Sequence, residues 1–146
     1  MQPPKSSGKK RSRVVAVHAG GAGHEVVTIV GGNGAYRRKP CPTCPWRKDM
    51  VGEFPAEAFR VSAHTAYDMA ESMFGCHTSG KARPSTCAGF LLNGSANNMA
   101  VRLALIRGSC KNDVRDGGHA LHASYREMAV ANGVNADDPV LVRCRE

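Results

Sequence analysis

The chain has 146 residues, of which 42% are hydrophobic and only 5% aromatic, and its formal net charge is +8. This length suits one domain, and the composition predicts a globular, turn-rich chain with a core of small side chains. No apolar run is long enough to span a bilayer, and no hydrophobic region follows the basic N-terminus as in a secretory signal. We therefore expect a cytoplasmic protein without a membrane partner.

Residues 1–13 are rich in Pro, Ser, Lys and Arg and are predicted to form a disordered basic tail. The tail has five basic residues and no acidic one, so it supplies +5 of the net charge of +8. A segment of this kind can bind along the phosphates of DNA or RNA, or it can be a solvated terminus.

Residues 14–36 are predicted to form a β-hairpin and a Gly-rich connector. The short β-branched runs at 14–18 and 25–30 are typical of strands, and the glycines around them are typical of turns. Since no Gly-Lys-Ser or Gly-Lys-Thr sequence follows these glycines, they do not form a phosphate-binding loop.

Residues 37–146 are predicted to form a metal-binding, α-rich domain that ends in an Asp-Pro turn and a short extended piece. Pro55 is suited to the first turn of a helix, and Gly108 is suited to a left-handed C-cap. The expected helices are 56–66, with Phe59 and Ala63 on one face; a short helical turn at 66–73; 96–107, with Met99, Leu103 and Ile106 on one apolar stripe; and 121–132. The predicted fold class is thus a small, loop-rich, metal-centred α+β domain with an N-terminal β-hairpin and two or three short helices.

Four cysteines in this domain predict a metal site. Cys41 and Cys44 are separated by two residues, a spacing that lets both thiolates face one ion from a tight turn. Cys76 and Cys87 are the nearest candidates for the other two ligands. Cysteines in a reducing compartment are more often metal ligands or free thiols than disulfides. A loop-rich chain with few large apolar side chains also gains much of its stability from a bound ion.

Other readings of these residues stay open. His77 is a possible alternate ligand, which gives three cysteines and one histidine, or it donates a hydrogen bond to a ligand sulfur. Cys76 and Cys87 can also be buried apolar thiols, and Cys41 with Cys44 can be a redox dithiol. The remaining two cysteines, Cys110 and Cys144, lie in predicted polar loop or tail positions. We interpret them as spare thiols, although either could complete the site.

The expected ion is zinc, which four thiolates bind tetrahedrally. Prolines after Cys41 and Cys44 are common in iron–sulfur loops, so an iron–sulfur cluster is the alternative cofactor. A closed four-thiolate site has no open position for a substrate, and no catalytic residue is predicted, so the sequence favours a non-enzymatic role.

Trp46 follows the first cysteine pair, and we expect it to be a core residue rather than a base-stacking one. The surrounding cations form a candidate nucleic-acid surface. These cations are Arg37, Arg38, Lys39, Arg47 and Lys48.

Four segments, KPCPTCPWRKD, GEFPAEAFR, FGCHTSGKARPSTCAGFLL and NMAVRLALIRG, resemble a family of short, uncharacterised cysteine proteins from actinobacteria and their phages. The run SYREMAVANGV is similar to it as well, so the resemblance covers residues 38–145. It implies a metal or cluster site at the same four cysteines and implies no activity.

The sequence therefore predicts a small cytosolic protein with a structural four-cysteine zinc site that acts as a binding or regulatory module. Nucleic acid and a host protein are its candidate partners, and an iron–sulfur or thiol redox protein is the alternative.

Overall fold

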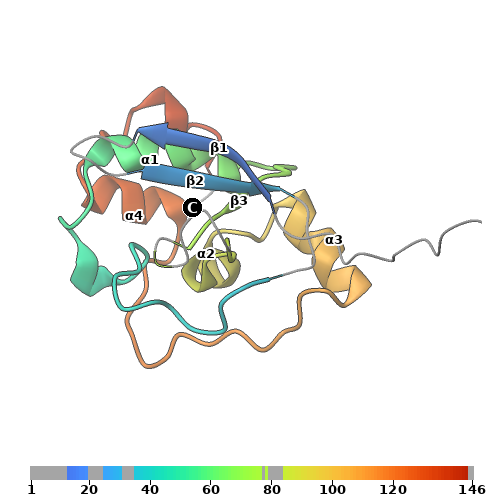
Figure 1. Cartoon of the computed structure of the whole chain (residues 1–146). Helices are drawn as coiled ribbons and strands as arrows, with labels where there is room; N and C mark the ends of the chain where they lie inside the picture. The colour runs from blue at the N-terminus through green and yellow to red at the C-terminus, as the bar shows by residue number, and fades with distance from the viewer. Residues whose placement is uncertain (1–12, 20–24, 31–34, 77, 79–83, 145–146) are drawn as a thin grey trace, which may run out of the picture.

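The structure is a computed structural model and describes residues 13–19, 25–30, 35–76, 78 and 84–144 (Figure 1). For residues 13–19 and 25–27 and for Val30 it describes the backbone alone. The predicted disordered tail lies outside the described residues except for Arg13, and so do the glycine loop of the hairpin and residues 31–34 of the Gly-rich connector.

An antiparallel hairpin opens the described chain, as predicted. Strand β1 (Arg13–Ala19) pairs with β2 (Glu25–Val30), and the register is shifted between Val14 and Ala16. A two-residue strand, β3 (Met73–Phe74), pairs antiparallel with β2 and completes the order β1-β2-β3. The hairpin is thereby joined to the cysteine-bearing region, and Ile29 of β2 is fully buried in the core.

Short helices lie around this sheet (Figure 1). Turns and longer loops connect most of them. No helix among the described residues has the length and apolar character needed to cross a membrane. The α-helices are α1 (Ala56–Ser62), α2 (Ala88–Asn93), α3 (Met99–Arg107) and α4 (Tyr125–Ala131), and the 3-10 helices are η1 (Lys48–Met50), η2 (Ala63–Ala66) and η3 (Pro139–Leu141).

Side-chain caps set the starts of the two C-terminal α-helices. Asn98 accepts a hydrogen bond from the N–H of Val101, and Ser124 accepts one from the N–H of Glu127. Gly108 ends α3 with a φ of 76°, which confirms the predicted left-handed C-cap. Because of these caps, α3 begins three residues later than the predicted 96 and α4 begins four residues later than the predicted 121.

The predicted helical turn at 66–73 is wrong. Helix η2 ends at Ala66, Met69 has a φ of 63°, and the chain becomes extended at β3. The predicted extended piece at the C-terminus is also wrong in part, because η3 forms after the Asp138–Pro139 turn. The sequence interpretation missed α2 altogether, so the four α-helices among the described residues exceed the two or three that were expected.

An aromatic core lies between the helices and the sheet. Trp46 is fully buried, with its ring 5.8 Å from that of Tyr125 and 6.3 Å from that of Phe74. Phe59 and Ala63 are both buried, as the predicted helix face required. The core is thus more aromatic than the composition suggested, because most of the large rings of the chain gather at one place.

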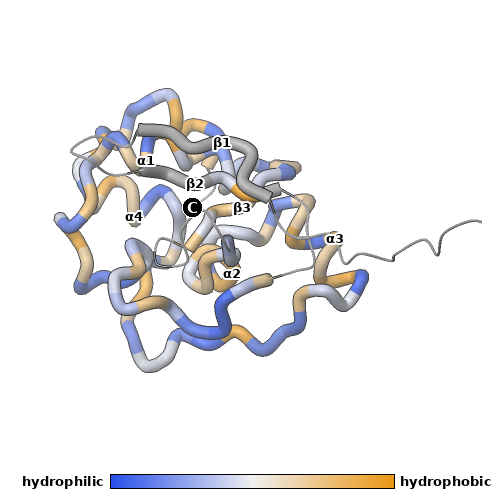
Figure 2. Tube along the Cα trace, viewed as in Figure 1, coloured by the Kyte–Doolittle hydropathy of each residue, from blue (hydrophilic) through white to orange (hydrophobic). Residues whose placement is uncertain are grey.

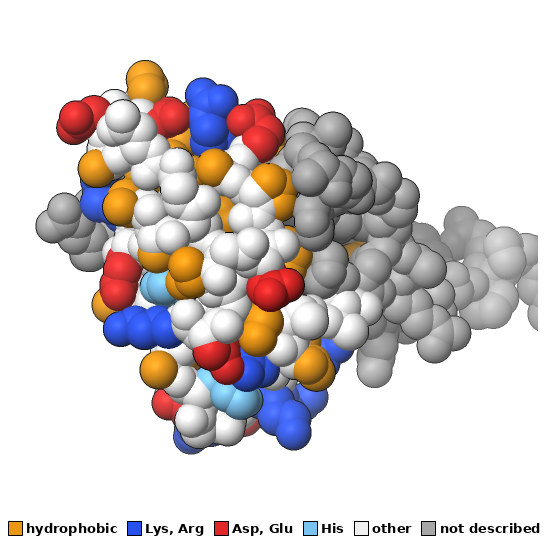
Figure 3. All heavy atoms as spheres, turned by 90° about the vertical axis from the view of Figure 1, so that its left-hand side faces the viewer, with side chains coloured by type: hydrophobic (Ala, Val, Ile, Leu, Met, Phe, Trp, Pro, Cys, Tyr) orange, Lys and Arg blue, Asp and Glu red, His pale blue; other side chains and the backbone are white. Residues whose placement is uncertain are grey.

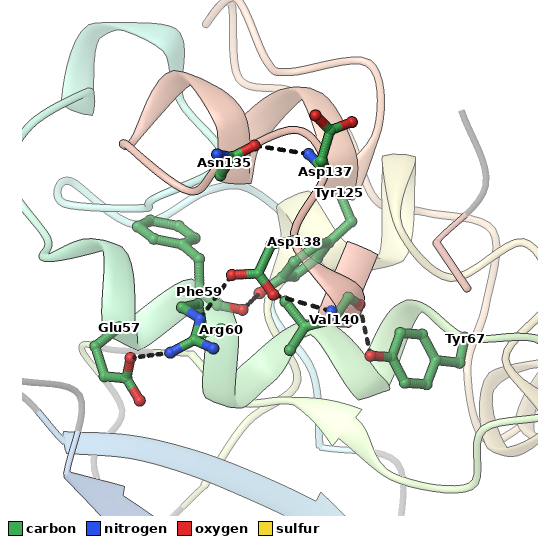
Figure 4. Close-up of polar contacts among 9 residues, drawn as sticks. All are labelled: Glu57, Phe59, Arg60, Tyr67, Tyr125, Asn135, Asp137, Asp138 and Val140. Atoms are coloured by element: carbon green, nitrogen blue, oxygen red, sulfur yellow. Dashed lines mark hydrogen bonds and ion pairs between the residues drawn. The ribbon is translucent and has the colours of Figure 1, made fainter. Parts of the chain in front are cut away.

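Polar contacts fix the C-terminal segment to α1 (Figure 4). The Arg60 guanidinium pairs with Asp138, with an N–O distance of 2.9 Å. The Tyr67 hydroxyl donates to the carbonyl of Val140, and the Tyr125 hydroxyl donates to that of Phe59. Through these contacts the end of the chain closes over the first helix.

Candidate metal centre

Cys41 and Cys44 lie on a tight turn that places both thiols inside the protein. The N–H of Cys44 donates to the carbonyl of Cys41 at 3.1 Å, and the N–H of Arg47 donates to the carbonyl of Cys44 at 3.1 Å. Both cysteines are buried. The backbone at Thr43 favours the thiolate of Cys41 and lowers its pKa, and the backbone at Trp46 acts in the same direction on Cys44. Pro45 has no N–H of its own, so this effect comes from the next residue.

Cys76 and Cys87 are brought together by two extended segments that pair with each other. The N–H of Cys76 donates to the carbonyl of Ser85, and the N–H of Cys87 donates to the carbonyl of Phe74. The two ends of the ten-residue stretch between these cysteines therefore lie side by side. Cys87 directly precedes α2, and both cysteines are buried.

The four thiols interact in a chain of pairs. Cys44 Sγ and Cys87 Sγ are 3.7 Å apart. The thiol of Cys41 interacts with those of Cys44 and Cys76, so the order of contact is Cys76, Cys41, Cys44, Cys87. All four are free thiols, and the 3.7 Å separation is far longer than a disulfide bond of about 2.05 Å.

The thiols interact in pairs, and they do not surround a common point. Across the described ranges, no group of three or more His, Cys, Asp or Glu side chains is arranged to hold a metal ion as it stands. The chemistry of the donor set nevertheless fits a soft, tetrahedral ion, since four buried thiols within one contact network are the ligands that such an ion prefers.

Hydrogen bonds divide the protons unequally between the thiols of the first pair. The thiols of Cys44 and Cys76 donate toward Cys41 and lower the pKa of that cysteine. The same contact with Cys41, together with Cys87 and burial, raises the pKa of Cys44. The hydroxyl of Thr78 also supports the anion of Cys41. Of the first pair, Cys41 is therefore the cysteine whose thiolate its neighbours favour.

Two arginines lie beside the sulfurs. Arg37 Nε donates to Cys76 Sγ at 2.8 Å. The Arg47 guanidinium feels the charges of Cys44 and Cys41, and it is held in place by Asp49 and by the carbonyl of Pro42. The sequence interpretation assigned both arginines to a nucleic-acid surface. Nothing in the sequence around Arg37 indicated a contact with Cys76, which lies 39 positions further along the chain.

Most other cations of that candidate surface are paired. Arg38 contacts Asp113 at 2.9 Å, and the Lys48 ammonium lies 3.6 Å from Glu127. Lys39 is exposed, and its side chain lies against Gly117. Figure 3 shows Lys and Arg side chains interspersed with Asp and Glu on the face that includes the left side of Figure 1.

Trp46 packs into a slot on α2, which confirms its prediction as a core residue. A Cβ added to Gly89 would lie 2.3 Å from Cβ of Trp46, and one added to Gly94 would lie 2.5 Å from its ring. Both glycines are therefore needed for the indole to reach its place. Since the ring is fully buried next to Cys44, it cannot stack on a base.

Three further candidates from the sequence are His77, Cys110 and Cys144. His77, the predicted alternate ligand, lies outside the described residues. Cys110 and Cys144 were expected in polar positions but are both buried. The thiol of Cys144 lies 3.7 Å from the carbonyl of Ala63, and burial raises the pKa of Cys144 to about 11. The pKa of Cys110 is likewise raised by burial.

Comparison with known proteins gave one result of substance. No curated protein and no solved structure matched the chain. A family profile matched residues 36–145, which is most of the chain and includes all six cysteines. The chain therefore belongs to the family of unknown function DUF6283.

Proposed function

We propose that the protein is a small binding or regulatory module stabilised by one zinc ion, with Cys41, Cys44, Cys76 and Cys87 as ligands. The observation that carries this proposal is the 3.7 Å contact between the sulfurs of Cys44 and Cys87, which join the two halves of the site. A tetrahedron with Zn–S bonds of about 2.3 Å has edges of about 3.8 Å. Two sulfurs at this separation already have the spacing of ligands to one ion.

The network of contacts supports a single ion over an iron–sulfur cluster. In a cluster of four irons each thiolate binds its own iron, so the sulfurs are spread around a larger inorganic core. Here Cys41 interacts with two other thiols and Cys44 also interacts with two. A single ion keeps two thiols at the separation of Cys44 and Cys87, whereas a four-iron cluster requires the pairs to separate.

Charge supports the same site. Four thiolates and one Zn²⁺ have a net charge of −2, which is costly to bury without compensation. The guanidinium of Arg37 donates to Cys76 and supplies one positive charge beside the sulfurs. Arg47 adds a weaker contribution, because its guanidinium is already paired with Asp49, and the backbone at Thr43 and Trp46 favours the thiolates of Cys41 and Cys44.

The role that follows is structural. Four protein thiolates leave no open position for water or substrate, so the ion stabilises the fold rather than performing chemistry. The ion would link the turn at residues 41–44 to the paired segments at 76 and 87, and these segments carry Trp46 and α2. Function would then depend on the surfaces that the stabilised fold presents.

Elemental analysis with an absorption spectrum on anaerobically purified protein tests the proposal. We expect one zinc per chain and a colourless sample. Replacing Cys44 by Ser should remove the zinc and lower the melting temperature strongly, because the binding energy of a structural ion is part of the folding energy. Cys110→Ser is the matched control, since this buried cysteine is outside the contact chain, and it should keep the zinc.

Other outcomes identify the alternatives. A brown sample with stoichiometric iron and sulfide would replace zinc with a cluster. Metal-free protein that forms a reversible Cys41–Cys44 disulfide would indicate a redox dithiol. Unchanged zinc content in the Cys44→Ser protein would reject this ligand set.

A further inference from the structure

Helix α3 presents an apolar stripe that the rest of the described chain leaves uncovered. Met99, Leu103 and Ile106 were predicted to share one face, and at 100° per residue they lie within about 60° of the helix circumference. This face lies outside the core, because Ile106 is 81% exposed, Leu103 is 36% exposed and Met99 is half-buried. The core side of α3 is formed by Val101, the helix residue that is buried. Figure 2 shows the hydrophobic residues of α3 at the edge of the molecule.

A cavity of about 250 Å³ lies beside this stripe. Its walls are mostly apolar, and Met99, Leu103 and Arg107 of α3 line it together with Met73 and Leu91. A protein cavity of about 150 Å³ can hold a benzene molecule. The cavity is therefore large enough for one bulky apolar side chain that projects from a partner seated on the stripe.

Positive charge borders the stripe on both sides. At 100° per residue, Arg102 lies about 40° beyond Ile106 and Arg107 lies about 40° beyond Leu103. Both arginines are exposed, and neither is in an ion pair with a described residue. Glu71 is an acidic residue that also lines the cavity, so positive charge is in excess around the apolar surface.

This charge pattern selects the occupant. A second copy that packed α3 against α3 would bring the arginines of both helices to the same seam, and like charges oppose such a pairing. The N-terminal residues 1–12 carry four basic residues and no acidic one, so they do not complement the surface either. A helix with an apolar ridge flanked by carboxylates satisfies both the stripe and its border.

We propose that the stripe Met99–Leu103–Ile106 and the adjoining cavity bind an amphipathic helix of a partner protein that has acidic residues on either side of an apolar ridge. One large side chain of that helix fills the cavity, and its acids pair with Arg102 and Arg107. The stripe and both arginines lie on α3, which carries none of the four thiols, whereas Met73 and Leu91 in the cavity wall belong to the segments next to Cys76 and Cys87. This inference therefore concerns the partner of the module and does not depend on which ion the module binds.

Selection from a displayed library of randomised helical peptides, with the full chain as target, tests the proposal. The enriched peptides should share an apolar ridge flanked by Asp or Glu. By fluorescence anisotropy, Ile106→Glu should weaken the binding of an enriched peptide at least about tenfold, since it places a charge in an apolar contact. Val142→Glu, at a residue that is 74% exposed elsewhere, is the matched control and should bind normally.

Exchanging the charges on both sides of the contact is a more specific test. The double variant Arg102→Glu/Arg107→Glu should lose the acidic peptide and gain the same peptide with Lys in place of its acids. No enrichment, enriched peptides without acids, or equal binding to the Ile106→Glu protein would each overturn the proposal. A dimer of the full chain that Ile106→Glu dissociates would assign the surface to a second copy instead. Zinc content, measured on every variant, shows separately whether the metal site has failed.

Discussion

At the scale of single residues, Arg37 places a positive charge beside one of the proposed zinc ligands. Arg37 donates to the sulfur of Cys76 at 2.8 Å, whereas its neighbour Arg38 is exposed and pairs with Asp113. Two adjacent residues of the same type thus have different roles, and only one of them is next to a proposed ligand.

Replacing Arg37 by Gln should weaken zinc binding about tenfold or more, because outer partners of metal ligands commonly contribute this much. Arg37→Lys should restore part of the affinity, since it keeps the positive charge. Competition with a chromophoric chelator measures the change. Arg38→Gln is the control, and an equal loss in that variant would mean that general surface charge, not the contact with Cys76, sets the affinity.

His122 is a second residue whose environment makes a prediction. The side chain is buried, and neither ring nitrogen has a hydrogen-bond partner among the described residues. Burial lowers the pKa of His122 below its ordinary value of 6.5, while the nearby carboxylate of Glu127 opposes this shift in part. The folded state therefore binds a proton less readily than the unfolded chain.

Since the unfolded chain takes up more protons, stability should fall as the pH decreases below about 6.5 and should be constant with respect to this group above that value. His122→Gln should flatten this part of the curve of unfolding free energy against pH. His119→Gln, at a half-buried loop histidine, serves as the comparison. The thiols release the same protons in both variants. The difference between the two curves of unfolding free energy therefore reports on His122.

At the scale of elements, α2 is defined by what packs against it more than by its own sequence. The helix has six residues and carries Gly89 in its interior, which is unfavourable for an isolated helix. It forms because Trp46 fills the space above Gly89 and Gly94. Packing on the indole therefore outweighs the low helix propensity.

Gly89→Ala should destabilise the protein by about 2 kcal/mol or more, although alanine is the better helix former by about 1 kcal/mol. The added Cβ would lie 2.3 Å from that of Trp46, so the backbone or the ring must move. Leu92→Ala, at an exposed position of the same helix, should cost less than about 1 kcal/mol. Denaturant unfolding of both variants compares the two, and a stabilised Gly89→Ala protein would contradict this packing.

At the scale of the whole molecule, the N-terminal residues carry an excess of positive charge, whereas most cations of the 37–48 cluster are paired. Residues 1–13 carry +5 of the net charge of +8. In the described part, Arg38, Arg47 and Lys48 lie beside acids and Arg37 is turned to a sulfur.

Nucleic-acid binding, where measured, should therefore depend on the N-terminal residues rather than on the 37–48 cluster. Removing residues 1–12 should abolish binding to a DNA or RNA oligonucleotide and its steep salt dependence. Arg47→Gln should change the affinity little, because this guanidinium is already paired with Asp49. Titrations by anisotropy at several salt concentrations measure both effects, and a reversed order would restore the cluster as the binding surface.

Sequence patterns predicted the features that local chemistry decides. The β-branched runs of the hairpin, the glycine at the end of α3 and the burial of Trp46 all follow from residue type and its immediate neighbours. Cys41 and Cys44 could be paired because a two-residue spacing lets both thiolates face one ion from a single turn. Cys76 and Cys87 were added to them as the nearest candidates in the sequence. The family match covers the same region.

Only the tertiary structure decided what depends on distant contacts. The pairing of Cys44 with Cys87, the turn of Arg37 toward Cys76 and the slot for Trp46 on α2 each join residues about 40 positions apart. The exposure of Ile106 is of the same kind, since periodicity gives a helix an apolar stripe but does not say whether another element covers it. Local sequence sets what each segment can form, whereas burial and partner are properties of the packed chain.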